Sequence, residues 1–134
     1  MGIQGLRIER GGRTWEVTSA VREGPQWRVM LKGVDDPRCR LQAIVEGARP
    51  PVASTLTIAV QNPQYRWFVD REERTWRAEV SPRYEYGQLI GNVVVFSSES
   101  SQDRYRYPHP GSDALGLMPD IKLLELLLRA QKGL

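Results

Sequence analysis

One three-residue phrase, Arg-Thr-Trp, occurs twice in the chain, and the residues around it constrain the fold more than any other feature. The phrase occupies residues 13–15 and 74–76. Alternating apolar and polar residues precede each copy, and β-prone residues follow it. This period of two is typical of a strand with one buried face. Each copy is therefore predicted to begin the return strand of a β-hairpin, with Trp15 and Trp76 in the core and the neighbouring Arg and Thr outside.

The turns of these two predicted hairpins differ. Gly11 and Gly12 lie between the first two strands, and a two-residue type I′ turn needs positive φ at both positions, which glycine adopts readily. Glu72 and Glu73 stand in the corresponding place of the second copy. We therefore expect a longer loop in the second hairpin.

Further β-prone segments follow each hairpin. Short runs bounded by clusters of turn residues predict strands, and they cover residues 27–32, 38–45 and 55–60, then 92–97 and 104–107. The second return strand is expected to end at Ser81-Pro82, and residues 84–91 show no clear period. Cys39 alternates with apolar residues, so it is predicted to lie in the core. Both halves run hairpin, strand, polar turn, strand and Pro-rich exit, which motivates the hypothesis of an internal repeat of residues 1–60 and 61–134.

The last segment has a different period and predicts one α-helix at about residues 119–131. Pro119 suits a helix start, where its missing N–H is harmless, and Gly133 suits the C-terminal cap. The apolar side chains, mostly Leu, cover far more of the helix than the stripe of roughly 100° that a surface helix buries. We therefore expect something besides one sheet face to cover this helix.

These elements together predict one domain of the mainly β class. A chain of 134 residues is long enough to bury a core without a disulfide or a metal. The expected architecture is an antiparallel meander of about eight or nine strands with one C-terminal helix, forming a sandwich or a partly open barrel.

The composition argues against several kinds of chemistry. With one Cys and one His, the chain cannot form an intrachain disulfide or fill a zinc site of about four Cys and His ligands. No glycine-rich phosphate loop or dinucleotide motif is present, so neither a cofactor nor a metal is predicted. The carboxylate pairs Asp35-Asp36 and Glu72-Glu73 fall at predicted turns, where solvated side chains are ordinary. An enzyme using His109 with a remote carboxylate is retained as a third hypothesis.

The sequence also bears on location. The N-terminus shows no basic region followed by an apolar run, so no signal peptide is expected, and no apolar stretch is long enough to span a bilayer. We expect a cytoplasmic protein that does not insert into membranes.

Single-stranded nucleic-acid binding is the alternative function. The net charge is +3, and residues 104–107 alternate Arg and Tyr on a predicted strand. Aromatic side chains on a sheet can stack bases while Arg contacts phosphates, which would assign this role to Tyr105, Tyr107, Arg104 and Arg106. Strand alternation, however, separates the Tyr pair from the Arg pair onto opposite faces.

The leading hypothesis is non-enzymatic. The apolar helix and the lack of converging catalytic groups favour a protein-interaction module, either an accessory subunit of a larger assembly or a self-associating oligomer. The contact is assigned to Leu123, Leu126 and Leu127 of the helix.

The second half resembles a class of small uncharacterised bacterial proteins. They open with an apolar-x-x-Asp-x-x-Gly-Arg-x-Trp-x-Val hairpin and end in a Leu-rich helix, and residues 66–131 follow this plan. Val69-Asp70 and Arg74-Thr75-Trp76 match the opening, whereas Glu73 replaces the Gly and an extra residue precedes Val80. The resemblance implies a bacterial origin and the fold plan, and it implies no activity.

Overall fold

The computed structural model describes residues 2–111 and 114–133, and eight strands in them form one antiparallel sheet. In chain order the strands are β1 (Arg7–Arg10), β2 (Arg13–Glu23), β3 (Gln26–Gly33), β4 (Arg40–Glu46), β5 (Tyr65–Val69), β6 (Thr75–Glu85), β7 (Gln88–Ser98) and β8 (Arg104–Pro108). Each strand pairs with the next, so the sheet order is β1 to β8 and the sheet is open. The mainly β class, the antiparallel meander and the C-terminal helix are confirmed.

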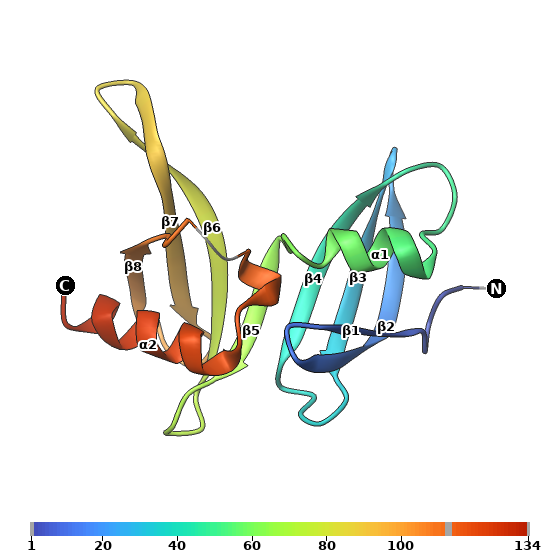
Figure 1. The fold of residues 1–134 in the computed structure, drawn as a ribbon, viewed down its shortest axis with the longest axis horizontal. Coiled ribbons are helices and arrows are strands. Elements are labelled where there is room, and N and C mark those ends of the chain that lie inside the picture. The colour runs from blue at the N-terminus through green and yellow to red at the C-terminus, as the bar shows by residue number, and fades with distance from the viewer. Residues whose placement is uncertain (1, 112–113, 134) are drawn as a thin grey trace.

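A helix follows each set of four strands. Helix α1 (Ala53–Ala59) follows β4, while the short 3₁₀-helix η1 (Leu115–Leu117) and helix α2 (Asp120–Gln131) follow β8. Both α-helices lie on the same side of the sheet (Figure 1). The two halves thus share an order of four strands and a helix, although common origin by duplication remains a hypothesis.

Each half has its own apolar core beneath its helix. In the first half, Trp15, Val29 and Leu41 from the strands pack with Leu56 and Val60 of the α1 region. The second core takes Phe68, Trp76, Val94 and Phe96 from the strands together with leucines of α2. Strands β4 and β5 join the halves through a short register of three residue pairs, Arg40 with Trp67, Leu41 with Arg66 and Gln42 with Tyr65.

The turn predictions are confirmed. Gly11 and Gly12 both have positive φ, 62° and 75°, as a type I′ turn requires. The second hairpin has the expected longer loop, residues 70–74, in which Glu73 takes a positive φ of 64°.

The predicted strand at 55–60 is wrong, because this segment belongs to helix α1. Leu56 and Val60 are one helical turn apart, and both are fully buried in the first core. A helical conformation therefore brings both side chains onto this core. The hydroxyl of Thr57, a residue that favours strands, donates to the carbonyl of Ala53 at 2.8 Å. Tertiary packing therefore overrides the β propensity of this segment.

Strand β6 does not end at Ser81-Pro82, as expected, but continues to Glu85 and pairs with β7 beyond that point. The register with β5 covers only Thr75 to Ala78. Pro82 therefore lies where β6 has no strand neighbour on the β5 side, a position in which the missing N–H is tolerated.

The repeated Arg-Thr-Trp phrase is buried as predicted at Trp15 and Trp76, but its arginines were placed on the wrong face. Residues two apart on a strand share a face, and the guanidinium carbon of Arg13 lies 5.7 Å from the ring centre of Trp15. Arg74 lies over Trp76 at 5.4 Å. Each phrase thus places a cation on its own indole ring.

Candidate functional site

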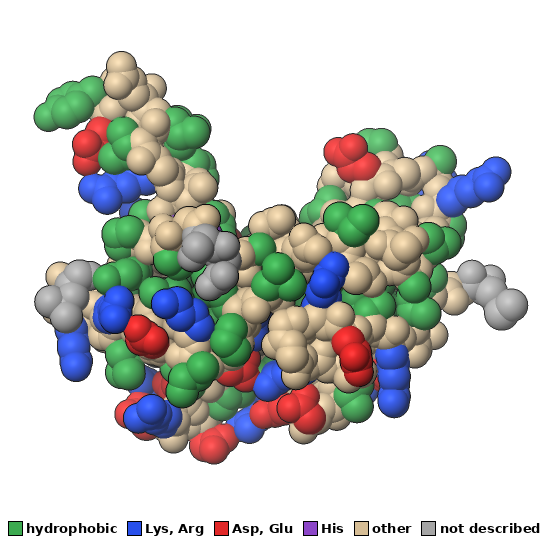
Figure 2. All heavy atoms as spheres, in the orientation of Figure 1, with side chains coloured by type: hydrophobic (Ala, Val, Ile, Leu, Met, Phe, Trp, Pro, Cys, Tyr) green, Lys and Arg blue, Asp and Glu red, His purple; other side chains and the backbone are tan. Residues whose placement is uncertain are grey.

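The free end of the β6–β7 hairpin projects beyond the rest of the sheet. Residues 81–85 of β6 and 88–93 of β7 pair with each other, and this ribbon extends away from the body of the molecule (Figure 1). Its end carries exposed apolar side chains, visible as green groups on both sides of the ribbon in Figure 2. Tyr84 is 61% exposed, Leu89 62% and Ile90 48%.

The turn of this hairpin presents a fully exposed aromatic side chain. Tyr86 and Gly87 form the turn between Glu85 and Gln88, and both have positive φ, 51° and 78°. A left-handed conformation costs a residue with a side chain about 1–2 kcal/mol, and Asn, Asp or Gly are the usual occupants of such turns. Tyr86 is nevertheless here and is fully exposed. Local turn stability does not explain this residue.

The three helix residues assigned to partner binding are not at the surface. Leu123, Leu126 and Leu127 are buried in the second core beneath α2, so they hold the helix on its own sheet. This assignment is corrected: the outward side of α2 carries Ile121, 65% exposed, and Leu128. The error arose because a nearly all-round apolar helix does not itself show which Leu face the sheet.

The four residues of the nucleic-acid hypothesis lie on two faces of β8. Tyr105 and Tyr107 are half-buried against the second core, and the ring of Tyr105 lies 5.9 Å from that of Trp76. Arg104 and Arg106 are exposed on the opposite face. The strand therefore separates the aromatic rings from the cations, as the alternation of the sequence indicates.

His109 has a local structural role. Its Nδ1 accepts a hydrogen bond from the backbone N–H of Gly111 at 2.9 Å, and the backbone N–H of His109 donates to the carbonyl of Asn92 at 3.0 Å. Within residues 2–111 and 114–133 no carboxylate forms an ion pair with it. The geometry of the described residues gives the third hypothesis no acid–base pair.

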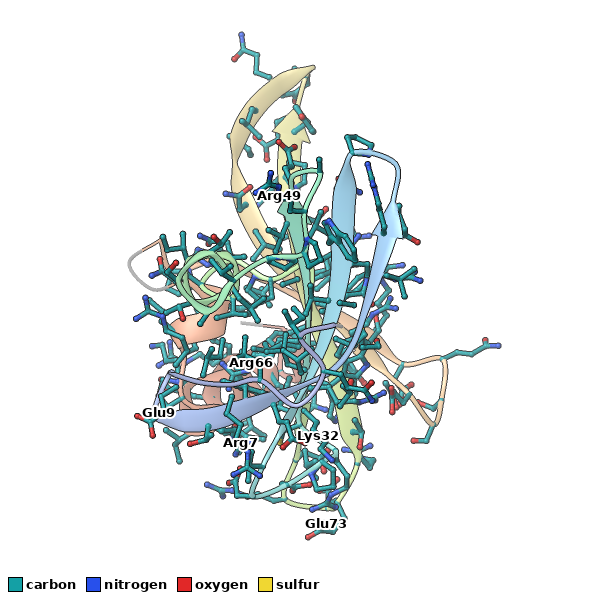
Figure 3. The ribbon with its side chains drawn as sticks, turned by 90° about the vertical axis from the view of Figure 1, so that its right-hand side faces the viewer. Arg7, Glu9, Lys32, Arg49, Arg66 and Glu73 are labelled. Carbon is teal, nitrogen blue, oxygen red and sulfur yellow. The ribbon has the colours of Figure 1, made fainter. Side chains whose placement is uncertain are left out.

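A charged cluster joins the two halves of the molecule. Arg66 of β5 is 2% exposed, and it lies in the middle of the molecule, whereas Glu73 lies at the end of a loop (Figure 3). Its guanidinium donates to Asp120 Oδ1 at 2.7 Å and to the carbonyls of Leu115 and Met118. Arg13 donates to Asp120 Oδ2 at 2.7 Å. Burial lowers the pKa of Arg66, and the charge of Asp120 opposes that shift.

Cys39 lies beside this cluster and is confirmed as a buried residue. Its Sγ is 3.9 Å from Asp120 Oδ2. Burial raises the pKa of the Cys39 thiol above its ordinary value, although Arg13 opposes the shift. A raised pKa leaves little thiolate at neutral pH, so the cluster lacks an activated nucleophile. In the described part of the chain, no three His, Cys, Asp or Glu side chains are grouped as metal ligands would be.

Comparison with protein-family models, with curated proteins and with solved structures gave no match.

Among the described residues, no helix has both the length and the apolar character needed to cross a membrane.

The exposed hairpin residues were missed at the level of sequence. The available signal is Tyr86-Gly87, a turn dipeptide flanked by β-prone residues on both sides. The order Tyr, Gly differs from the usual Asn-Gly or Asp-Gly of two-residue turns, and Pro82 further disguised the continuation of the strand.

Proposed function

We propose that this chain is a non-enzymatic protein-interaction module that binds a protein partner through the free end of the β6–β7 hairpin. The observation that carries the proposal is Tyr86, a fully exposed aromatic residue in a left-handed conformation. Tyr is enriched among the residues that dominate binding energy at interfaces. Strained backbone is retained where it serves a purpose other than stability.

The surrounding surface supports the same role. Tyr84, Leu89 and Ile90 at the same end of the ribbon are exposed as well. An isolated two-stranded ribbon is marginally stable in water, and exposed apolar clusters on soluble proteins mark interaction sites. A partner that covers these side chains would remove them from water and order the ribbon.

The test is the substitution Tyr86→Asn, because Asn favours the left-handed turn that Tyr resists. We expect unchanged or slightly higher stability, by up to about 1 kcal/mol, together with loss of the partner. Affinity capture from cells of the source organism would compare the wild type, Tyr86→Asn and the control Ile58→Asn, which alters an equally apolar residue exposed on α1.

Proteins retained by the wild type and by Ile58→Asn, and lost with Tyr86→Asn, are the expected result. Sedimentation of the purified chain checks in parallel whether the partner is a second copy. Retention of the same proteins by Tyr86→Asn would contradict the proposal.

A further inference from the structure

A groove at the base of the β6–β7 hairpin combines positive charge with an apolar floor. Its volume is about 360 Å³, and residues of three strands line it. Arg83 comes from β6 and Arg104 and Arg106 come from β8. No Asp or Glu is found among the described residues that line the groove.

The arginines of the groove are weakly neutralised. Arg104 is 3.9 Å from Glu79, at the limit of an ion pair, and Arg83 pairs with Glu85 at 3.1 Å with both side chains half exposed. Arg106 forms no ion pair within the described residues. Arg106 is therefore the arginine of the groove that, among the described residues, can bind an entering anionic group without breaking an ion pair.

Part of the groove lining suits aliphatic side chains. Val93, Pro82 and Pro108 present accessible apolar surface, whereas Val95 beneath them is buried. Tyr84 connects this surface to the apolar end of the hairpin. An extended peptide points every second side chain toward the surface beneath it. A segment whose groove-facing positions carry both carboxylates and aliphatic side chains can therefore meet the arginines and the apolar side chains.

The rest of this sheet face offers little to a longer polyanion. Its other basic side chains are interleaved with acidic ones: Arg40 pairs with Glu99 at 2.5 Å, Lys32 with Glu16 at 3.7 Å and Arg28 with Glu23 at 3.3 Å. Arg77 lies over the ring of Tyr65 at 4.4 Å. A nucleic acid gains affinity from each phosphate that finds a cation. The groove instead gathers three arginines without a carboxylate among its described lining residues, and it has the size of a small binding pocket.

We propose that the groove binds an extended acidic peptide segment whose groove-facing side chains are carboxylates and aliphatic groups. This inference rests on the proposed function, since the segment would belong to the protein partner that also contacts Tyr86. Arg106 would bind a carboxylate, and Val93, Pro82 and Pro108 would contact the aliphatic side chains.

The test is an NMR titration of the ¹⁵N-labelled chain with synthetic eight-residue peptides. One peptide places Glu and Val in turn at every second position, with Ser between them, and the matched control has Gln in place of each Glu. We expect amide shifts at residues 81–84, 93–95 and 104–108 with the acidic peptide only, and weaker binding as salt rises.

Charge reversal at single residues provides the controls. Arg106→Glu is expected to weaken the acidic peptide by about tenfold or more, as the loss of a charge-assisted hydrogen bond predicts. Arg28→Glu, the same change at an exposed residue of the first half, is expected to leave the affinity unchanged. Circular dichroism confirms that both variants are folded.

Three results would overturn the inference: equal binding of the Gln peptide, shifts outside the groove, or tighter binding of an eight-nucleotide oligo-dT that Arg106→Glu abolishes. The last would assign the groove to nucleic acid. Tyr86→Asn separates this inference from the proposed function, because that variant should still bind the acidic peptide while losing the protein partner.

Discussion

At the scale of single residues, Trp15 and Trp76 occupy matching core positions in the two halves, but their indole N–H groups have different hydrogen-bond partners. The indole N–H of Trp15 donates to the carbonyl of Arg10 at 3.1 Å, and that of Trp76 donates to Asp70 Oδ2 at 2.8 Å. A buried indole N–H needs such a partner. The second hairpin therefore uses a side chain where the first uses its backbone.

Asp70 makes stability dependent on pH at this point. Burial opposes its ionisation, but hydrogen bonds from Trp76, from the backbone N–H of Arg74 and Glu72, and from the Arg74 side chain outweigh burial and lower the pKa of Asp70 below 3.8. Because the folded pKa is lower than the unfolded one, the stabilisation is complete above the unfolded value and is lost as pH falls through the folded value.

The corresponding prediction uses Asp70→Asn. At neutral pH the free energy of unfolding of the variant should be about 1–3 kcal/mol lower than that of the wild type, because the acceptor charge is lost. That difference should shrink as pH falls below about 4. Urea denaturation of both proteins at several pH values measures it, and a difference that stays constant down to pH 3 would refute this account.

At the scale of elements, burial decides the role of each helix. Helix α2 holds Leu123, Leu126 and Leu127 on the second core, with Leu128 exposed. Helix α1 covers the first core with fewer residues and leaves Ile58 in water. Both helices follow their fourth strand and close the open side of that half.

Two identical truncations on α2 test this assignment. Leu126→Ala removes a buried side chain and should destabilise the chain by about 2–5 kcal/mol. Leu128→Ala removes a side chain that is 46% exposed and should cost less than about 1 kcal/mol. Thermal unfolding of both variants measures the contrast. Equal losses of stability in the two variants would mean that α2 does not pack on the sheet through Leu126.

At the scale of the whole molecule, Asp120 connects the two halves. Its two carboxylate oxygens accept from Arg13 of β2 and from Arg66 of β5. This contact supplements the short β4–β5 register. The guanidinium of Arg66 is buried, so removing its counter-charge leaves an uncompensated cation in the interior.

Asp120→Asn is therefore expected to destabilise the protein by about 3 kcal/mol, because a buried ion pair loses one partner. The matched control is Asp35→Asn, which removes an exposed carboxylate 3.5 Å from the same Arg13 and should change stability by less than about 0.5 kcal/mol. Chemical denaturation measures both. Similar values for the two variants would show that Asp120 does not couple the halves.

Most elements of the fold were predictable because strand alternation and turn chemistry are local. The Gly11-Gly12 turn, the core positions of Trp15 and Trp76 and the terminal helix follow from neighbouring residues alone. Helix α1 could not be predicted in this way, because Thr and Ile favour strands. The segment is helical because that conformation buries Leu56 and Val60 in the first core. The candidate surface around Tyr86 was also missed, since an unusual turn residue hid the hairpin.

The sequence by itself determined the mainly β class, the tryptophan-centred hairpins and the place of the last helix, because periodicity and turn residues act over a few positions. Only the tertiary structure decided which leucines of α2 are buried, that Asp120 pairs with arginines of both halves, and that β6 and β7 continue into a projecting ribbon. Those features depend on residues far apart in the chain, and burial, not local preference, selects among their alternatives.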